Sequence, residues 1–239
     1  MSRSSVDSRP FIFKQFQLLH HLSTMKVGMD ATILGIWASV YEGMNALDVG
    51  CGSGVISLLL ASRAKCRITA IDIDKPSIVE CAENFAQSKY HEQLSVEHNS
   101  LQNFCENQKD KFDLVVSNPP FFTFGKASAN PRLGQARHTI SLTYNDLINY
   151  SFGILKPNGV FSIVIPYSNR NIFVEQSKQV GFYLHRQMIV FPKRGMPPNR
   201  IYLCFSKDFR LFQEERLSIR EENGEFTVEF KLLVNDFYL

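Results

Sequence analysis

The sequence predicts an α/β fold built on a mostly parallel sheet with helices on both faces. Three observations support this prediction. Strand-like and helix-like segments alternate from residue 46 to residue 180, the order expected when helices cross over between parallel strands. An apolar run at residues 46–49 leads into a glycine-rich turn and then a helix-like segment. A second apolar run at residues 112–117 ends at an Asn-Pro-Pro-Phe turn, and open parallel sheets place their ligands beyond such strand ends.

The predicted elements follow one another in chain order. Strands are expected at residues 46–49, 67–71, 94–97, 112–117 and 160–165. Helices are expected at residues 31–40, 55–63, 76–89, 144–155 and 168–180, with Asp30 as the N-cap of the first. Two further strands, residues 183–191 and 201–205, end the alternation and fit an antiparallel last strand. The acidic tail that follows indicates edge structure and a closing segment.

Composition limits the class of protein. The 239 residues, with 44% hydrophobic and 21% charged side chains, suit one domain over residues 1–239, with residues 1–24 as an N-terminal arm. No apolar stretch approaches the roughly 20 residues that span a bilayer, and no signal-peptide core is visible, so we expect a cytoplasmic protein without a membrane partner. Five cysteines without a C-x-x-C pair predict neither disulfides nor a metal site. A net charge of +3 permits a nucleic-acid partner without requiring one.

The glycine-rich turn runs from Asp48 to Gly54 as Asp-Val-Gly-Cys-Gly-Ser-Gly. Glycines at alternate positions let the backbone turn tightly and approach a ligand closely. A nicotinamide fingerprint would place its third glycine at Val55, so this spacing does not match that class of site. Asp72 follows Gly54 by 18 residues, about where a carboxylate meets ribose hydroxyls in nucleotide-binding α/β folds. The alternative for Asp72 is a carboxylate bonded only to backbone.

The turn Asn118-Pro119-Pro120-Phe121 has its own chemistry. Prolines donate no hydrogen bond and stiffen the chain, so Asn118 presents a side-chain carbonyl and Pro119 a free backbone carbonyl. Phe121 or Phe122 adds a flat apolar face. Two acceptors beside an aromatic plane suit a planar ring that carries an exocyclic NH2 group. The plainer alternative is a loop that merely ends a strand.

These motifs resemble those of a known superfamily. The glycine turn resembles motif I of class I S-adenosylmethionine-dependent methyltransferases, and Asn-Pro-Pro-Phe resembles motif IV of their amino-methyltransferase branch. The runs Phe13-Lys14-Gln15-Phe16 and Met25-Lys26-Val27-Gly28, then Asp30, Leu34-Gly35 and Trp37-Ala38, narrow the resemblance to bacterial tRNA valine adenine N6-methyltransferases. That family modifies the adenosine 3′ of the anticodon. The resemblance implies a Rossmann-like, seven-stranded sheet with an antiparallel last strand, S-adenosylmethionine as cofactor and the tRNA anticodon loop as partner.

The resemblance also implies roles for individual residues. The catalytic turn is Asn118, Pro119, Pro120 and Phe121. The cofactor-binding residues are Lys26, Asp30, Asp48, Gly50, Gly52, Gly54, Asp72, Ile73, Ser100 and Leu101. Ser100 stands where the superfamily often carries an Asp that receives the adenine amino group. Lys26 suits the carboxylate of the methionine end, and an exposed salt bridge is its alternative.

Two basic loops are expected near the same edge of the sheet. They supply the candidate RNA contacts Phe122, Lys126, Arg132, Arg137, Lys193, Arg194 and Arg200. Long loops of this kind are usually functional, and basic side chains there suit a phosphate backbone. A solvated surface loop is the alternative for each residue.

Rival functions share the same motifs. Enzymes that methylate the side-chain amide of protein glutamine use the same Asn-Pro-Pro-aromatic turn, and DNA adenine methyltransferases are a further possibility. A non-catalytic S-adenosylmethionine-fold module that binds RNA would not need the intact turn. We therefore expect a monomeric enzyme that methylates an adenosine N6 in tRNA.

Overall fold

The computed structural model describes residues 9–24, 26–106, 108–109, 111–120 and 142–238. The strands of its main sheet are β3 Asn45–Val49, β4 Arg67–Asp72, β5 Leu94–His98, β6 Phe112–Ser117, β7 Leu155–Pro166, β8 Tyr183–Phe191, β9 Arg200–Ser206 and β10 Gln213–Ser218. The helices are α1 Met29–Trp37, α2 Val55–Arg63, α3 Lys75–Gln87, α4 Leu101–Cys105, α6 Tyr144–Ile154, α7 Arg170–Val180 and α8 Val228–Val234. Short 3-10 turns lie at His91–Gln93 and Tyr167–Asn169.

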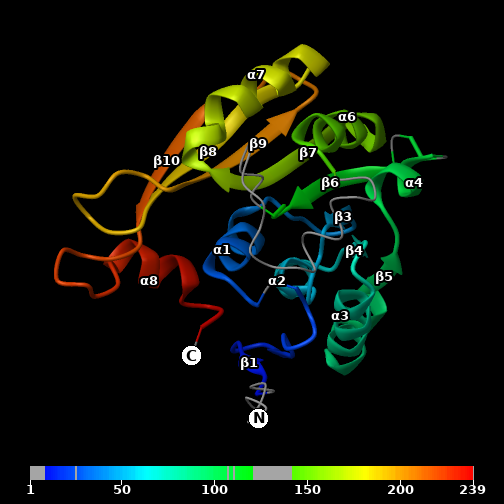
Figure 1. Cartoon of the computed structure of the whole chain (residues 1–239), viewed down its shortest axis with the longest axis horizontal. Helices are drawn as coiled ribbons and strands as arrows, with labels where there is room; N and C mark the ends of the chain where they lie inside the picture. Colours follow the sequence, from blue (N-terminus) through cyan, green and yellow to red (C-terminus); the bar gives the residue numbers. More distant parts are fainter. Residues whose placement is uncertain (1–8, 25, 107, 110, 121–141, 239) are drawn as a thin grey trace, which may run out of the picture.

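The described strands form one sheet in the order β10-β8-β9-β7-β6-β3-β4-β5 (Figure 1). Neighbours pair in parallel except at β9, which is antiparallel to both β7 and β8. This arrangement confirms the predicted fold class. The sheet has one strand more than the seven implied by the resemblance, because β10 adds to the edge beside β8. Its Gln-Glu-Glu-Arg start lacks the apolar pattern that marks a buried strand.

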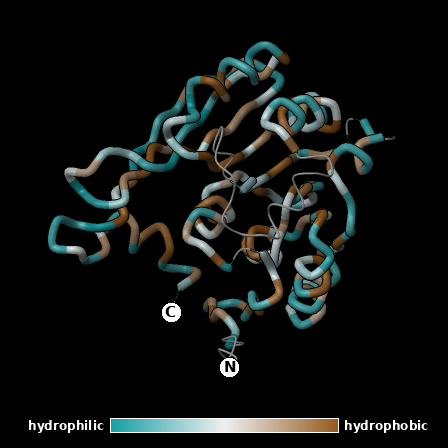
Figure 2. The backbone as a smooth tube through the Cα atoms, viewed as in Figure 1, coloured by the Kyte–Doolittle hydropathy of each residue, from teal (hydrophilic) through white to brown (hydrophobic). Residues whose placement is uncertain are grey.

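Both faces of the sheet are buried under helices. Successive side chains of a strand point to opposite faces, so Ala46 joins one apolar cluster and Leu47 the other. The first cluster packs against α1, α2, α3 and α8, and the second against α4, α6 and α7. Figure 2 shows the hydrophobic stretches concentrated in the middle of the molecule and hydrophilic stretches in the outer turns. The central strands are therefore fixed by packing on both faces, and so are the turns at their ends.

The N-terminal arm lies beside the C-terminal end of the chain (Figure 1). Its strands β1 Phe11–Ile12 and β2 Gln17–Leu18 form a small antiparallel sheet. The ring of Phe13 stacks on the rings of Phe16 and Tyr238, with distances between ring centroids of 4.7 Å and 5.5 Å. The described part of the arm therefore contains two short paired strands and packs its aromatic rings on the end of the chain.

One predicted cap is wrong. The first helix begins at Met29, its N-cap is Gly28, and no side chain caps it. Asp30 lies inside the first turn, where a carboxylate still favours the positive end of the helix. Within the described ranges, no helix is long and apolar enough to cross a membrane.

Candidate active site

Three predicted site elements lie side by side at the carboxyl edge of the sheet. In the pairing of β3 with its two neighbours, Val49 is opposite both Ile71 and Ser117. The next residues along the three strands are Gly50, Asp72 and Asn118, so the register brings together the glycine turn, the predicted ribose carboxylate and the predicted catalytic turn. Sequence reasoning placed these three correctly relative to one another, because parallel strands end at one edge.

The glycine turn leaves open space where a ligand would approach. Gly50 and Gly52 have φ values of +72° and +54°, in the left-handed region that favours glycine. A Cβ atom added at either position would meet no heavy atom within 4 Å. At Gly54, by contrast, an added Cβ would lie 2.6 Å from Phe85 Cε1. Gly50 and Gly52 therefore fit a cofactor cradle, whereas Gly54 is required for packing against α3.

Asp48 lies beneath the turn and has zero exposed surface. Its Oδ2 accepts hydrogen bonds from Ser57 Oγ at 2.7 Å and Ser57 N at 3.2 Å. Burial raises the pKa of Asp48 to about 7, although the bonds from Ser57 act in the opposite direction. Its other oxygen has no hydrogen-bond partner among the described residues. Asp48 thus joins the glycine turn to the first turn of α2, and its side chain is buried away from the open space at Gly50 and Gly52.

Asp72 and Ile73 form the corner expected for a nucleoside. Asp72 is partly exposed, and its two oxygens accept from the backbone N–H of Gly52 at 2.9 Å and Asp74 at 2.8 Å. Burial raises its pKa, while these backbone bonds lower it. The adjacent Ile73 side chain is 50% exposed, which is unusual for a large apolar residue beside a buried strand end and fits the flat face of a base.

The segment after β5 closes this corner. Asn99 N donates to the carbonyl of Asp72 at 3.0 Å, which holds Ser100 nearby. The hydroxyl of Ser100 accepts from Asn103 N at 3.2 Å and caps α4. Leu101 is only 3% exposed and belongs to the core. Only the main chain of Leu101 is therefore available to a ligand.

Asn118 presents an unused acceptor. Ser117 Oγ donates to the carbonyl of Val49 at 2.9 Å and fixes the end of β6 against β3. The Oδ1 atom of Asn118 is buried and has no hydrogen-bond partner among the described residues. Pro119 is buried and Pro120 is exposed. A buried carbonyl without a donor is costly, so this atom fits a ligand that supplies an N–H group.

The structure joins two residues that the sequence assigns to different partners. Arg200 Nε donates to Asp30 Oδ2 at 2.8 Å, and Tyr202 OH donates to the backbone carbonyl of Asp30 at 3.3 Å. Arg200 reaches this edge because β9 is antiparallel and pairs its first residue with Pro166, the last of β7. The predicted cofactor residue Asp30 and the predicted RNA residue Arg200 therefore form one ion pair. Lys26, four residues before Asp30, is exposed.

Apart from Arg200, the candidate RNA contacts divide into three groups. Lys193 is partly exposed on the loop between β8 and β9. Arg194 is already paired with Glu221 at 3.0 Å and Glu229 at 2.8 Å, so two carboxylates compete with any phosphate for it. Other predicted residues lie outside the part of the chain that the structure describes: Phe121 of the catalytic turn, and Phe122, Lys126, Arg132 and Arg137 of the RNA set.

Sequence reasoning missed the residues that support the site from behind. Ser57 holds Asp48, and two polar residues of α3, Glu80 and Asn84, are buried beside the glycine turn. Their signal was present in the sequence. Glu80 and Asn84 are one helical turn apart, and each directly precedes a buried apolar residue, Cys81 or Phe85. They therefore lie on the apolar face of an amphipathic helix. Polar residues at such positions need buried partners.

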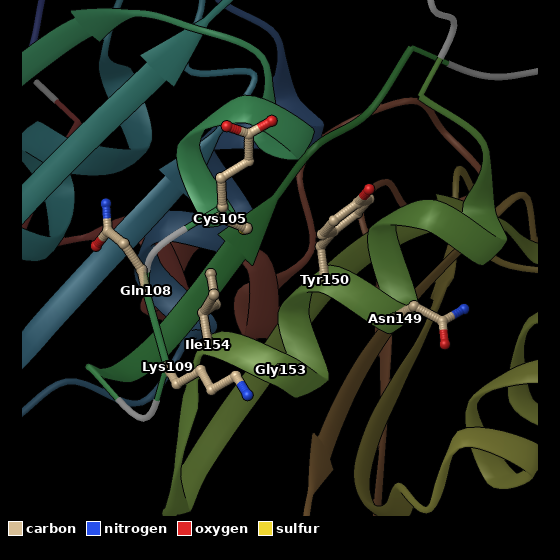
Figure 3. A pocket seen from close by; sticks show the side chains of 8 residues that line it. Cys105, Gln108, Lys109, Asn149, Tyr150, Gly153 and Ile154 are labelled. Atoms are coloured by element: carbon tan, nitrogen blue, oxygen red, sulfur yellow. The ribbon is translucent and has the colours of Figure 1, made fainter.

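A surface hollow elsewhere does not belong to this site. A hollow of about 460 Å³ lies between α4 and α6. Figure 3 shows side chains that line it, among them Cys105, Gln108, Lys109 and Tyr150. Residues 105–109 lead into the start of β6 and Ile154 leads into the start of β7. The hollow therefore lies at the amino edge of the sheet, opposite the glycine turn.

A family model covers most of the region described above. The family "Methyltransferase small domain" matches residues 37–177, a range that includes the glycine turn, Asp72 and Asn118.

Curated relatives match nearly the full chain. A protein from Photorhabdus laumondii named tRNA1(Val) (adenine(37)-N6)-methyltransferase is 35% identical over 231 residues, which cover 96% of this chain and 95% of that protein. A protein of the same name from Phocaeicola vulgatus is also 35% identical, over 96% of this chain and 97% of its own length.

Solved structures share the fold at lower identity. A predicted O-methyltransferase from Agrobacterium tumefaciens superposes with a TM-score of 0.65 at 15% identity, over 87% of this chain and 96% of that chain. Pyrococcus horikoshii TYW2 in complex with MeSAdo superposes with a TM-score of 0.61 at 12% identity, over 86% and 74% of the two chains.

Proposed function

Because the chain belongs to the family of tRNA1(Val) (adenine(37)-N6)-methyltransferases, we propose that it methylates N6 of adenosine 37, next to the anticodon of a valine tRNA. It is an S-adenosylmethionine-dependent enzyme that acts on an adenosine in tRNA. One observation supports the assignment of the site above all others. The Asn118 Oδ1 atom is a buried acceptor without a donor among the described residues, directly beside the glycine turn.

The acceptor side of the reaction depends on position. The N6 amine of adenine is a poor nucleophile because its lone pair is delocalised into the ring. Asn118 Oδ1 and the carbonyl of Pro119 each accept one N–H of this amine, which fixes the nitrogen and directs its lone pair away from the ring plane. Bound S-adenosylmethionine supplies an electrophilic methyl group on a positively charged sulfur. Orientation and electrostatics would then carry the transfer, in which the nitrogen–methyl bond forms as the sulfur–methyl bond breaks. The methylated nitrogen would be positively charged and therefore strongly acidic, so it would release one proton to solvent. No described side chain has to act as a nucleophile or strong base.

The cofactor side follows from the open space at the glycine turn and the residues around it. Gly50 and Gly52 leave room for the cofactor, and Asp72 offers its remaining lone pairs to the ribose hydroxyls. The half-exposed Ile73 covers the adenine, with Ser100 and the main chain of Leu101 at its edge. Lys26 and Asp30 line the methionine end. Asp48 and Gly54 act indirectly, by holding the turn against α2 and α3.

The RNA side combines a stacking face with basic loops. Phe121 stacks on the target base after it leaves its neighbours, with Phe122 beside it, and loop bases are accessible to such recognition. Lys126, Arg132, Arg137 and Lys193 contact phosphates, whereas Arg194 and Arg200 contribute less because carboxylates already bind them. We further propose that residues 1–239 act as one domain with residues 1–24 as its arm, as a monomer, in the cytoplasm where tRNA is processed.

Labelling with tritiated S-adenosylmethionine tests the substrate class. The purified chain is incubated separately with bulk tRNA, duplex DNA and a protein extract. We expect label in tRNA alone, and loss of that label in Asn118→Ala. Label in protein would indicate the glutamine chemistry that shares the Asn-Pro-Pro-aromatic turn, and label in DNA an adenine methyltransferase of another class. Cofactor binding without transfer to any of the three would leave only a binding module.

A further inference from the structure

A carboxylate of α3 binds the backbone of the N-terminal arm. Glu80 has zero exposed surface. Its Oε1 accepts from the backbone N–H of His21 at 2.6 Å and of Leu22 at 2.7 Å, and its Oε2 accepts from Ser23 N at 2.9 Å and from the Ser23 hydroxyl. Three successive backbone amides thus surround one carboxylate, an arrangement that binds anions strongly.

The hydrogen bonds determine the charge state of this group. Burial alone raises the pKa of Glu80, but the bonds from Leu22, Ser23 and His21 outweigh it and lower that pKa below its ordinary value. Glu80 is therefore ionised near neutral pH, although no water reaches it. A neutral replacement would leave several buried amides with a poorer acceptor, and unpaired buried amides are costly.

Asn84 joins the same arm to the glycine turn. It lies one helical turn after Glu80 and therefore on the same face of α3. Its Oδ1 accepts from Leu19 N at 2.8 Å, while its Nδ2 donates to the carbonyl of Leu19 at 2.9 Å and to that of Ser53 at 2.9 Å. Ser53 stands between Gly52 and Gly54. One amide side chain therefore connects the arm, α3 and the glycine turn.

The chain on either side of these contacts leads to the cofactor pocket. The anchored residues 19–23 continue to Lys26 and Asp30, and His20 Nδ1 accepts from Val27 N at 3.2 Å, which extends the fastening along the segment. The helix that holds them starts directly after the Asp72 corner. The helix α3 thus holds both the N-terminal arm and the glycine turn.

We infer that Glu80 and Asn84 are positioning residues for the cofactor, which hold the arm and the glycine turn in the arrangement that binds S-adenosylmethionine. The inference rests on the proposed function, because it takes this pocket to be the cofactor site. Neither side chain is expected to touch the cofactor. Both act through the backbone of residues 19–23 and through Ser53.

Calorimetry with S-adenosylmethionine tests the inference. Glu80→Gln and Asn84→Ala are each expected to raise the dissociation constant at least about tenfold. Glu80→Gln replaces one buried oxygen by an NH2 group that cannot accept from a backbone amide and leaves a weaker, neutral acceptor in place of the other, and Asn84→Ala removes three hydrogen bonds. At saturating cofactor, kcat on tRNA should stay within about twofold of the wild type, because bound cofactor restores the arrangement of the arm and the glycine turn and Asn118 is unchanged. Hydrogen exchange of the backbone amides at residues 19–24 should accelerate in the same variants.

Glu83→Gln provides the matched control. It makes the same chemical change on the exposed side of the same helix, where Glu83 accepts only from Gln87 among the described residues. We expect its cofactor affinity to equal that of the wild type. If Glu80→Gln fails to fold, Ser23→Ala decides, because it removes one hydroxyl donor and should raise the dissociation constant about threefold.

Unchanged cofactor affinity in Glu80→Gln, with faster exchange in the arm, would overturn the inference, and so would an equal loss in Glu83→Gln. These outcomes differ from a failure of the proposed function. If the wild-type chain binds no S-adenosylmethionine, the proposed function fails. If the wild type binds and transfers, and the Glu80 variant matches it, only this inference fails.

Discussion

At the scale of single residues, the proposed mechanism gives Asn118 and the cofactor-binding residues separate roles. In this proposed mechanism Asn118 Oδ1 faces the acceptor, whereas Gly50, Gly52 and Asp72 form the donor side. We therefore predict that Asn118→Ala lowers kcat by about a hundredfold or more, the usual effect of removing one preorganised hydrogen bond. Its affinity for S-adenosylmethionine should remain near that of the wild type. Steady-state kinetics with calorimetry measures both, and near-normal turnover would contradict the proposed mechanism.

A second residue-scale prediction concerns Asp48. Its pKa is about 7 in the folded chain against an ordinary 3.8, because it is fully buried. The folded state therefore binds this proton more tightly than the unfolded state, so its contribution to stability is complete below about pH 4 and is lost as the pH rises to about 7. Each pKa unit corresponds to about 1.4 kcal/mol.

Urea unfolding of the cofactor-free protein at about pH 5 and about pH 8 measures this effect. We expect the wild type to lose stability relative to Asp48→Asn between the two pH values, because the amide does not titrate. The nearby charge of Asp72 contributes to the same shift and is present in both proteins. An equal response of the two proteins would show that Asp48 is ionised throughout.

At the scale of elements, the glycine turn separates backbone strain from packing. Gly54 has φ +86° and an added Cβ would lie 2.6 Å from Phe85 and 2.8 Å from Cys81. Gly43 has φ +79° with no heavy atom within 4 Å of an added Cβ. Alanine at either position costs about 1–2 kcal/mol of backbone strain, and only Gly54→Ala adds about 1–3 kcal/mol of overpacking.

We therefore predict that Gly54→Ala destabilises the fold more than Gly43→Ala does, and that it alone weakens cofactor binding. Urea unfolding and calorimetry of the two variants provide the comparison. Equal losses of stability would mean that the contact between the turn and α3 is not tight.

Elements with a strong local pattern were predictable from the sequence. The bounds of α2, β6 and β8 agree with the predicted ranges, because glycine or proline interrupts an apolar run at one or both ends of each. The short helix α4 was not predicted, since five residues carry little periodicity. The acidic tail was predicted to hold edge structure, which β10 confirms, but the bounds of this strand were not predicted because it buries few side chains.

The site was predictable only where it follows from strand ends. The Asp30–Arg200 pair joins residues 170 positions apart, and no local pattern reveals such a contact. Glu80 was equally hidden, because its partners are the backbone amides of a segment 57–59 residues earlier. The motifs indicated which residues are candidates for the site. The long-range contacts that hold these residues in place are visible only in the tertiary structure.

At the scale of the whole molecule, we expect the basic loops near the carboxyl edge of the sheet to bind a negatively charged substrate. If basic side chains hold tRNA phosphates there, each contact releases counterions, and tRNA affinity should fall steeply as salt rises. We predict that reversing Arg132 and Arg137 together to Glu weakens tRNA binding and flattens this dependence, while S-adenosylmethionine affinity stays unchanged. Filter binding over a range of salt concentrations measures it. A flat response of the wild type would argue against an RNA substrate.

The position of the methyl group tests the central claim most directly. Unmodified valine tRNA and the same transcript with adenosine 37 replaced by guanosine are incubated with the chain and S-adenosylmethionine, then digested to nucleosides for mass spectrometry. The account predicts N6-methyladenosine from the first transcript, none from the second, and none from either with Asn118→Ala. N6-methyladenosine in equal amount from both transcripts, or undiminished formation by the Asn118 variant, would contradict it.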